Sequence, residues 1–538
     1  MHTVSEVWDD YLKYENVIKP QFLVTLVFGH GLYSILRNNI HPATFPGAMR
    51  LCTGENPYFE HNGQPYFFSP AILEHPEITH EIIPHQKRVS ELSAKTTISA
   101  NANFPFEIFD SGGTLCILMR IDLALPGMDL SNVINLFIGQ VTGAEFDRTS
   151  KKISLAGRDG DPIRAVRFPP GDIALGRDQF SQMPLNVAGR FRRTVALGSV
   201  TYPILCPQVD TGKLFYVCES TISPHSNTSK TPFTVTVNGE NVSSGNPEFG
   251  WELVALENNA PTIGVGEPKG ISTFLRFKKE IKLELPFVTC SGFSGLSPNK
   301  SPILTLLDYA QYPVCAEARG QLEQQSLLIS SLVNVNDSVL SIVNDRLIPQ
   351  TPYFSGFLNG YFTLFDFAGI HTNLQLAPGN GLYGRALGNV SETRPEDIYN
   401  AIDIGYHRNI YSDDEVDVSQ LVYMLDETNA TGKLAEDLKQ STAIYGRRYI
   451  KVDFPDVPVE KGKVPDIIKQ IAHDFLALAC KQRSLHTYDA PLSAIKIPLN
   501  TKLYLTDPLV SITHKYVRVV SKTYFLHKVR MVFQDENT

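Results

Sequence analysis

The sequence predicts a mainly β protein with α+β portions, organised as several domains. Over roughly the first 300 residues, runs rich in Val, Ile, Thr, Phe and Tyr recur between turn residues, which is the pattern of short strands. Helical periodicity begins only near residue 301. A chain of 538 residues is long enough for three or four domains of about 150 residues each.

Strands are clearest at four places in the first 300 residues. Residues 135–142 and 152–156 are predicted to form a strand pair joined by a polar turn. Residues 233–239 alternate and end in Asn-Gly, which is typical of a two-residue hairpin turn. Residues 281–285 alternate apolar and charged side chains, so a further strand is expected there.

Helices are expected in the second half of the chain. Ser301 followed by Pro302 is typical of a helix start, and an apolar run follows it. Residues 322–343 show mixed apolar periodicity and are predicted to hold one or two helices.

The C-terminal third predicts an α+β module. A helix over 433–444 is followed by a turn at 445–448 and a strand over 449–454. The apolar stripe of 465–480 predicts the strongest helix of the chain. We expect the last segment of the chain, from about residue 505, to complete a sheet, and the 465–480 helix to pack onto that final sheet.

Composition and charge exclude several classes of protein. A net charge of -8 argues against a nucleic-acid scaffold, and the basic run Arg190–Arg193 is interpreted as a solvated or interface loop. Seven cysteines, an odd number without C-x-x-C, indicate buried free thiols made in a reducing cytosol. We expect no secretory signal and no membrane-spanning helix, because the required apolar runs are missing.

Two patterns approach cofactor or metal sites. Gly379–Gly384 matches G-x-G-x-x-G, but Pro378 and the glycine-broken stretch that follows favour a loop over a dinucleotide site. His80 and His85 are one residue too far apart for the zinc-protease spacing, and Pro84 would break the helix. Ordinary surface histidines are the favoured interpretation, although a loop metal site that includes His75 stays open.

Two further patterns approach catalysis or calcium binding. Gly292–Gly295 resembles a serine-nucleophile turn, but Leu296 replaces its last glycine, so a Gly/Ser loop is favoured. Asp413–Asp417 lacks the spacing and the glycine of a calcium loop, and a solvated acidic loop is favoured. We therefore predict no catalytic, cofactor-binding or metal-binding residues, no cofactor and no enzymatic activity.

The order of several weaker motifs resembles the baseplate hub, or central tail-tip protein, of long-tailed bacteriophages and related tail-like particles. The strand pair at 135–141 and 152–159 is similar to one found in such hubs. Residues 185–207 with 214–217 resemble the linker into a second hub domain, although the usual P-x-x-Y-G core is not intact. Residues 441–448, the helix after them and 510–514 resemble the end of the hub body.

The resemblance implies a homotrimeric structural protein of the virion, at the tail tip or baseplate, synthesised in the host cytoplasm. Three subunits, each with two tail-tube-like β-barrel domains, would form a ring that caps the tail tube. Its partners would be the tube or a distal tail protein, the C-terminus of the tape measure protein, and tip or fibre proteins, with no specific nucleic-acid binding. The expected domains are a first barrel (1–185), a β-rich domain (186–300), α+β parts with the second barrel (301–500) and closing strands that pack back on the hub (501–538).

Two other functions stay open. The chain contains 22 Tyr and 30 Phe, and such aromatic content would suit a β-rich host-glycan-binding adhesin or carbohydrate-active tail protein. Only two tryptophans are present, and aromatic residues of β proteins usually fill cores. The second alternative is a metal-dependent hydrolase that uses His75, His80 or His85 with nearby carboxylates.

Overall fold

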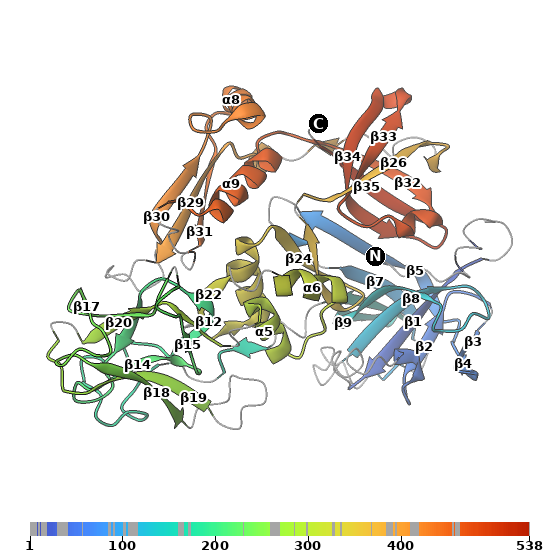
Figure 1. Ribbon diagram of the computed structural model, residues 1–538. Helices are drawn as coiled ribbons and strands as arrows, with labels where there is room; N and C mark the ends of the chain where they lie inside the picture. The colour runs from blue at the N-terminus through green and yellow to red at the C-terminus, as the bar shows by residue number, and fades with distance from the viewer. Residues whose placement is uncertain are drawn as a thin grey trace.

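The computed structural model is made of five regions, each formed mainly by a different stretch of the chain (Figure 1). It describes residues 8, 11, 19–29, 41–55, 57–83, 88–89, 92–100, 104–105, 117–159, 166–170, 174–229, 231–258, 270–283, 286–296, 300–324, 329–333, 336–366, 368–383, 391–392, 395–408, 419–454, 457 and 463–536. Asp413–Asp417, His85 and Gly384 lie outside this set.

The N-terminal region is an antiparallel sheet in the order β2-β1-β8-β9-β10-β7-β5. Its strands are β1 (Gln21–Phe28), β2 (Met49–Cys52), β5 (Ile72–Ile83), β7 (Ser93–Ser99), β8 (Ile117–Ala124), β9 (Ile134–Asp147) and β10 (Lys152–Arg158). The predicted strand pair at 135–142 and 152–156 is confirmed as β9 and β10. A hairpin, β3 (Tyr58–His61) and β4 (Gln64–Phe67), projects from this region.

The C-terminal region is a second sheet in the order β26-β33-β34-β35-β32. Its strands are β26 (Ile370–Pro378), β32 (Ser484–Pro491), β33 (Thr501–Asp507), β34 (Ile512–Tyr524) and β35 (Lys528–Asp535). Alternate residues of β33 are buried, and β34 is buried continuously from Val517 to Lys522. Leu503, Leu505, Val517 and Val519 belong to a core shared with the N-terminal sheet. The expectation that the last strands complete a sheet is confirmed, and the earlier strands with which they pair include β26 and β5.

Helices cover the opposite face of the N-terminal sheet. α5 (Pro302–Tyr309), α6 (Ala316–Gln324) and the helical turn Ile342–Leu347 share a core with Val27, Leu118 and Ile138. The N-terminal sheet is covered on both faces here, so β8 is almost continuously buried. The start of α5 is confirmed. The one or two helices predicted within 322–343 are found at the two ends of this range, in α6 and in the helical residues from Val339 onward. Between them, β22 (Ser330–Val333) pairs with β12 (Val195–Val200).

Residues 174–296 form a module of small sheets around its own core. Its strands are β12, β13 (Ile204–Pro207), β14 (Leu214–Glu219), β15 (Ser223–Pro224), β16 (Thr234–Val237), β17 (Glu240–Asn241), β18 (Trp251–Asn258), β19 (Gly270–Phe277), β20 (Phe287–Ser291) and β21 (Phe293–Ser294). The hairpin turn is confirmed, with φ of +49° at Asn238 and +87° at Gly239. The strand expected at 281–285 is wrong for its described part, although Ile281 is buried in the core.

The α/β module consists of the sheet β30-β29-β31 and two helices. Its elements are β29 (Ala401–Arg408), β30 (Ser419–Leu425), α8 (Gly432–Tyr445), β31 (Tyr449–Phe454) and α9 (Asp466–Ala479). The helix, turn, strand and helix predicted here are confirmed. The predicted packing of α9 is wrong: its apolar stripe lies on β29 and β30, in a core with Ile402, Ile404 and Leu425, not on the final sheet.

The molecule is therefore mainly β with few helices and several sheets. No closed barrel is found among the described strands. Of the described helices, none has the length and apolar character needed to cross a bilayer.

Candidate functional site at the junction of the two sheets

Strand β34 joins the N-terminal and C-terminal sheets. Its first half pairs with β33, and its last residues, Ser521–Tyr524, pair with Ile78–Glu81 of β5. The hydroxyl oxygens of Thr79 and Thr523 share a hydrogen bond of 3.3 Å across this pairing. Segments more than 400 residues apart in the chain are therefore held by ladder hydrogen bonds, which makes the two sheets one continuous wall.

A buried lysine closes the junction. Lys522 is 1% exposed, and its Nζ donates to the carbonyl oxygens of Ala494 at 3.1 Å, Ile495 at 3.0 Å and Ile497 at 2.8 Å. These carbonyls belong to the 3₁₀ turn Leu492–Lys496 and the residue after it. The ammonium gives all three a donor, and Ala494 O also accepts the backbone N–H of Ile497 at 3.1 Å. Burial lowers the pKa of Lys522 to about 7, while the three carbonyl oxygens favour the protonated form.

His80 lies directly opposite Lys522 on β5 and is buried. Burial, and then the charge of Lys522, lower the pKa of His80 to about 3, so the imidazole is neutral at physiological pH. The interpretation of His80 as a surface histidine is wrong, because the ring packs edge-on against Phe365 at 6.2 Å. His75 is exposed on the same strand. Within the described part of the chain, no three His, Cys, Asp or Glu side chains form a metal-binding group.

A second polar cluster lies at the middle of β34. Arg518 is buried, forms an ion pair with Glu536, and donates from Nη1 to Asn500 Oδ1 at 2.9 Å. Lys502 Nζ lies 3.1 Å from the second carboxylate oxygen of Glu536. Burial would raise the pKa of Glu536, but the charges of Arg518 and Lys502 lower it below its ordinary value. Arg518 is therefore a buried cation paired with a carboxylate, whereas Lys522 donates to backbone carbonyl oxygens.

Arg483 connects the α/β module to the C-terminal sheet. It donates to the carbonyl oxygens of Ala477 at 2.6 Å and Leu478 at 3.0 Å, near the end of α9. Its Nη1 donates to the carbonyl oxygen of Asp535 at 2.7 Å, at the end of β35. A guanidinium at a helix C-terminus also interacts favourably with the helix dipole.

The Val510–His514 motif lies at the turn between β33 and β34. Ser511 has a φ of +60°, and the ring of His514 stacks on Tyr504 at 4.2 Å with an interplanar angle of 6°. Tyr504 in turn lies 5.1 Å from the ring of Tyr516. The motif therefore ends in a row of rings across the face of the C-terminal sheet.

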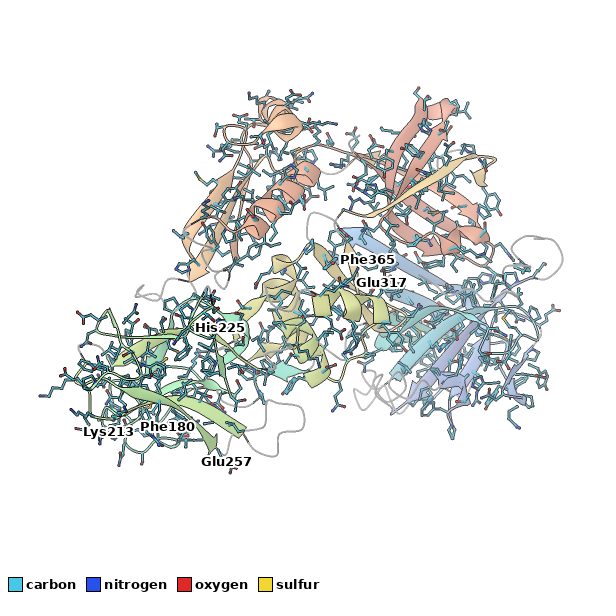
Figure 2. The ribbon with its side chains drawn as sticks, viewed as in Figure 1. Phe180, Lys213, His225, Glu257, Glu317 and Phe365 are labelled. Carbon is cyan, nitrogen blue, oxygen red and sulfur yellow. The ribbon has the colours of Figure 1, made fainter. Side chains whose placement is uncertain are left out.

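The structure brings a histidine to the serine of Gly292–Gly295. His225 (labelled in Figure 2) has its Nε2 3.2 Å from Ser294 Oγ and 3.3 Å from Ser199 Oγ. Its Nδ1 lies 2.9 Å from the carbonyl oxygen of Thr231. Because a carbonyl only accepts, Nδ1 carries the hydrogen and Nε2 accepts from a serine hydroxyl. This is the orientation of a catalytic base.

The surroundings of Ser294 do not support acyl transfer. An oxyanion needs free N–H donors, but Gly292 N donates to Val200 O and Gly295 N to Gly198 O, each at 2.9 Å. Two serines also share one ring nitrogen, so neither hydroxyl is fixed for attack. We interpret His225 as a side chain that ties β12, β21 and the Thr231 segment together.

The other sequence patterns are structural where they are described. Gly379 and Gly381 have φ of +78° and +79° in the turn after β26, as expected for a loop. Of the basic run Arg190–Arg193, Arg190 and Arg192 are exposed. Arg193 is not in a solvated loop, because it is buried against Glu219 with an N–O distance of 2.8 Å.

The sequence predicted the state of the cysteines but not the buried lysine at the junction. The described cysteines are free thiols, and all but Cys315 are buried, as predicted. Sequence reasoning missed Lys522 and its three carbonyl partners. The available signal was a single charge in the apolar strand Val519–Tyr524, but its acceptors come from a separate turn.

Comparison with known proteins gives distant structural likenesses. No family model and no curated protein matches the chain. A tail protein from Neisseria meningitidis MC58 is 8% identical, with a TM-score of 0.34 over 88% of this chain and 94% of that one. A prophage tail protein from Listeria monocytogenes EGD-e is 8% identical, with a TM-score of 0.35 over 88% and 91%. The 43 kDa tail protein of prophage MuSo2 from Shewanella oneidensis is 6% identical, with a TM-score of 0.36 over 89% and 97%. Likenesses this distant fix neither the fold family nor the function of this chain.

Proposed function

We propose that this chain is a structural hub of a phage tail tip or baseplate. The observation that supports it most is the junction of β5 and β34, which joins two sheets from opposite ends of the chain into one wall. Open antiparallel sheets have edges that can pair or pack laterally, which a ring-forming protein requires. The order of hub-like motifs in the sequence supports the same proposal.

In this proposal three subunits form a ring with six tube-like sheets that caps the tail tube. The first tube-like domain would be residues 1–185. The second would combine strands from 301–500 with the closing strands of 501–538, and residues 186–300 would be a separate β-rich domain. The ring would contact the tube or a distal tail protein, the C-terminus of the tape measure protein, and tip or fibre proteins, and the genome would pass through it during ejection.

We further propose that the protein is not an enzyme. The strongest catalytic geometry among the described residues is Ser294 with His225, and its neighbouring backbone donors are occupied. A scaffold needs rigid packing and not a reactive side chain, and the buried junction supplies such packing.

The test is the mass of the purified full chain in solution, measured by light scattering, together with averaged images of negatively stained particles. The hub predicts a threefold ring with a central opening and six peripheral lobes. A preparation that stays monomeric, both alone and with a purified tail-tube protein from the same particle, would overturn it.

A glycan-binding function is a second candidate, favoured by the β3–β4 hairpin. Tyr58 and Phe67 lie opposite each other and are 59% and 52% exposed, with ring centroids 5.5 Å apart. Exposed aromatic rings can stack on sugar rings. Binding to a broad glycan array that is lost in Tyr58→Ala and Phe67→Ala would support this function, and no binding by the wild-type chain would exclude it.

A further inference from the structure

Two histidines meet where the β3–β4 hairpin contacts the rest of the N-terminal region. His61 ends β3, and the centroid of its ring lies 5.8 Å from that of His41, which caps the 3₁₀ turn Pro42–Thr44. The backbone N–H of Leu130, in the loop between β8 and β9, donates to the carbonyl oxygen of Glu60 at 2.7 Å. Figure 1 shows the hairpin at the outer side of this region. These two contacts, His61 with His41 and Glu60 with Leu130, form the seat of the hairpin.

His41 is buried, and its backbone contact fixes where its hydrogen lies. The backbone N–H of Ala43 donates to Nδ1 at 3.2 Å, so Nδ1 is the acceptor and Nε2 carries the hydrogen. Nε2 makes no hydrogen bond with any described group, although Asp122 Oδ2 lies 3.7 Å from it. A second proton would have to bind at Nδ1 and would remove the contact with Ala43. The geometry therefore holds this ring in its neutral form.

Asp122 is already paired and does not compensate a charge on His41. Each of its carboxylate oxygens accepts from Arg120 Nε at 2.8 Å, and Oδ1 also accepts from Asn135 Nδ2 at 3.0 Å. Arg120 brings a positive charge close to the buried ring. Burial, and then the charges of Arg120 and His61, hold the pKa of His41 well below its ordinary value.

The other charged groups at the seat do not compensate it either. Asp129 Oδ1 lies 3.9 Å from His61 Nδ1, beyond hydrogen-bond distance, and accepts from the backbone N–H of Ser131 at 2.7 Å. Arg50 donates from Nε to the carbonyl oxygen of Ala43, so it adds a second cation beside the turn. A proton on His41 would therefore be buried close to cations, with each nearby carboxylate bonded elsewhere.

We propose that the histidine pair at this seat holds the β3–β4 hairpin in place at neutral pH and releases it in acid. With the hairpin seated, His61 helps to cover His41, which stays neutral. Once the hairpin leaves, the ring of His41 meets water and takes up a proton with the ordinary histidine pKa of about 6.5. The released state binds more protons than the seated state, so the seat is stable above about pH 6.5 and weakens as the pH falls below it.

Release would also move the exposed ring pair of the hairpin. Tyr58 and Phe67 lie opposite each other on β3 and β4, so acid would control the candidate glycan site. That consequence rests on the glycan-binding function, whereas the release is measured without any ligand. Acid release in a chain that binds no glycan would leave the histidine seat in place and exclude only the glycan function.

The experiment measures amide hydrogen exchange of the full chain by mass spectrometry at pH 7.5 and pH 5.0, corrected for the intrinsic rate at each pH. The reporters are the hairpin amides and Leu130, whose N–H bonds to the hairpin. One histidine that is neutral when seated and has an ordinary pKa when released raises the opening constant up to about thirtyfold over this range. The amides of β9 serve as the internal reference and should not share this rise.

Two variants make the test specific. His41→Asn keeps a side-chain acceptor for the N–H of Ala43 but does not titrate, so the rise between pH 7.5 and 5.0 should disappear. His75→Asn, at an exposed histidine of β5, is the control and keeps the rise. His80 is unchanged in both variants, so its own acid sensitivity cancels in the comparison. The proposal is overturned if the hairpin is equally protected at both pH values in the wild type, if His41→Asn shows the wild-type rise, or if β9 rises as much as the hairpin.

Discussion

The junction of β5 with β34 and the outer edge of β30 differ in whether a described strand pairs with the edge. At the junction, the strand that carries Lys522 is covered, and the lysine is buried with three carbonyl acceptors. At β30, a strand without any charge has no described neighbour on its second edge. A charge in a strand therefore does not mark it as exposed, and an apolar strand is not necessarily covered. What decides the outcome is whether the rest of the chain supplies partners.

The largest expected effect on stability comes from removing the buried ammonium group of Lys522 at the junction. In Lys522→Met the stem still fills its space, but three buried carbonyl oxygens lose the ammonium, although Ala494 O keeps the N–H of Ile497. We therefore expect a loss of about 2–4 kcal/mol in the free energy of unfolding. Urea denaturation of the full chain measures it. Lys528→Met is the control, since Lys528 is half-exposed and its ion pair with Asp489 contributes about 1 kcal/mol or less. Equal losses in both variants would show that the junction is not specially stabilised.

The pH dependence of the free energy of unfolding gives a second test of the junction. The pKa of Lys522 is about 7 in the folded chain, against 10.5 for an ordinary lysine. Between these values the unfolded chain binds more protons, so stability rises with pH, by up to about 1.4 kcal/mol per pH unit. Below pH 7 both states are protonated and the cost of the buried charge is present in full. Denaturation from pH 6 to 10 should show a steeper rise for the wild type than for Lys522→Met, and parallel curves would contradict it.

Hydrogen exchange separates the two edges without a mutation. Amides of Ser521–Tyr524 should exchange only when the sheets come apart, because the paired ladder and the core cover them. Outward-facing amides of β30 should exchange within seconds. Slow exchange of all β30 amides would mean that another part of the chain covers this edge.

The smallest effect is expected at the Ser–His contact. Ser294→Ala removes one hydroxyl that shares the Nε2 of His225 with Ser199, so the free energy of unfolding should fall by about 1 kcal/mol or less. A fluorophosphonate probe should label neither the wild type nor the variant. Labelling of the wild type that disappears in Ser294→Ala would show a reactive serine and contradict the proposal that the chain is not an enzyme.

Much of the local structure could be predicted because it depends on nearby residues. The helices α8 and α9, the strand between them, the β9–β10 pair and the Asn238-Gly239 turn each follow from periodicity or turn chemistry within a short window. The errors have a different origin. Residues 330–333 form a strand because a distant strand, β12, pairs with them, and residues 281–283 do not because none does.

Candidate sites were harder to predict than elements. The rejection of the histidine and glycine patterns rested on spacing, which is local. That His225 would reach Ser294, 69 residues away, could not be inferred, because it depends on how β15 lies beside β21. The same is true of Lys522, whose acceptors lie on a turn about 25 residues earlier in the chain.

The β-rich composition, the periods of the strands and helices, and the turns all follow from the amino-acid sequence, because they depend on side chains a few residues apart. Tertiary structure alone decided that the last strands join the first sheet, that α9 packs on β29 and β30, and that a lysine is buried while β30 is left at an edge. The reason is that a strand satisfies its hydrogen bonds with whichever edge is brought beside it, and the local pattern does not specify that edge.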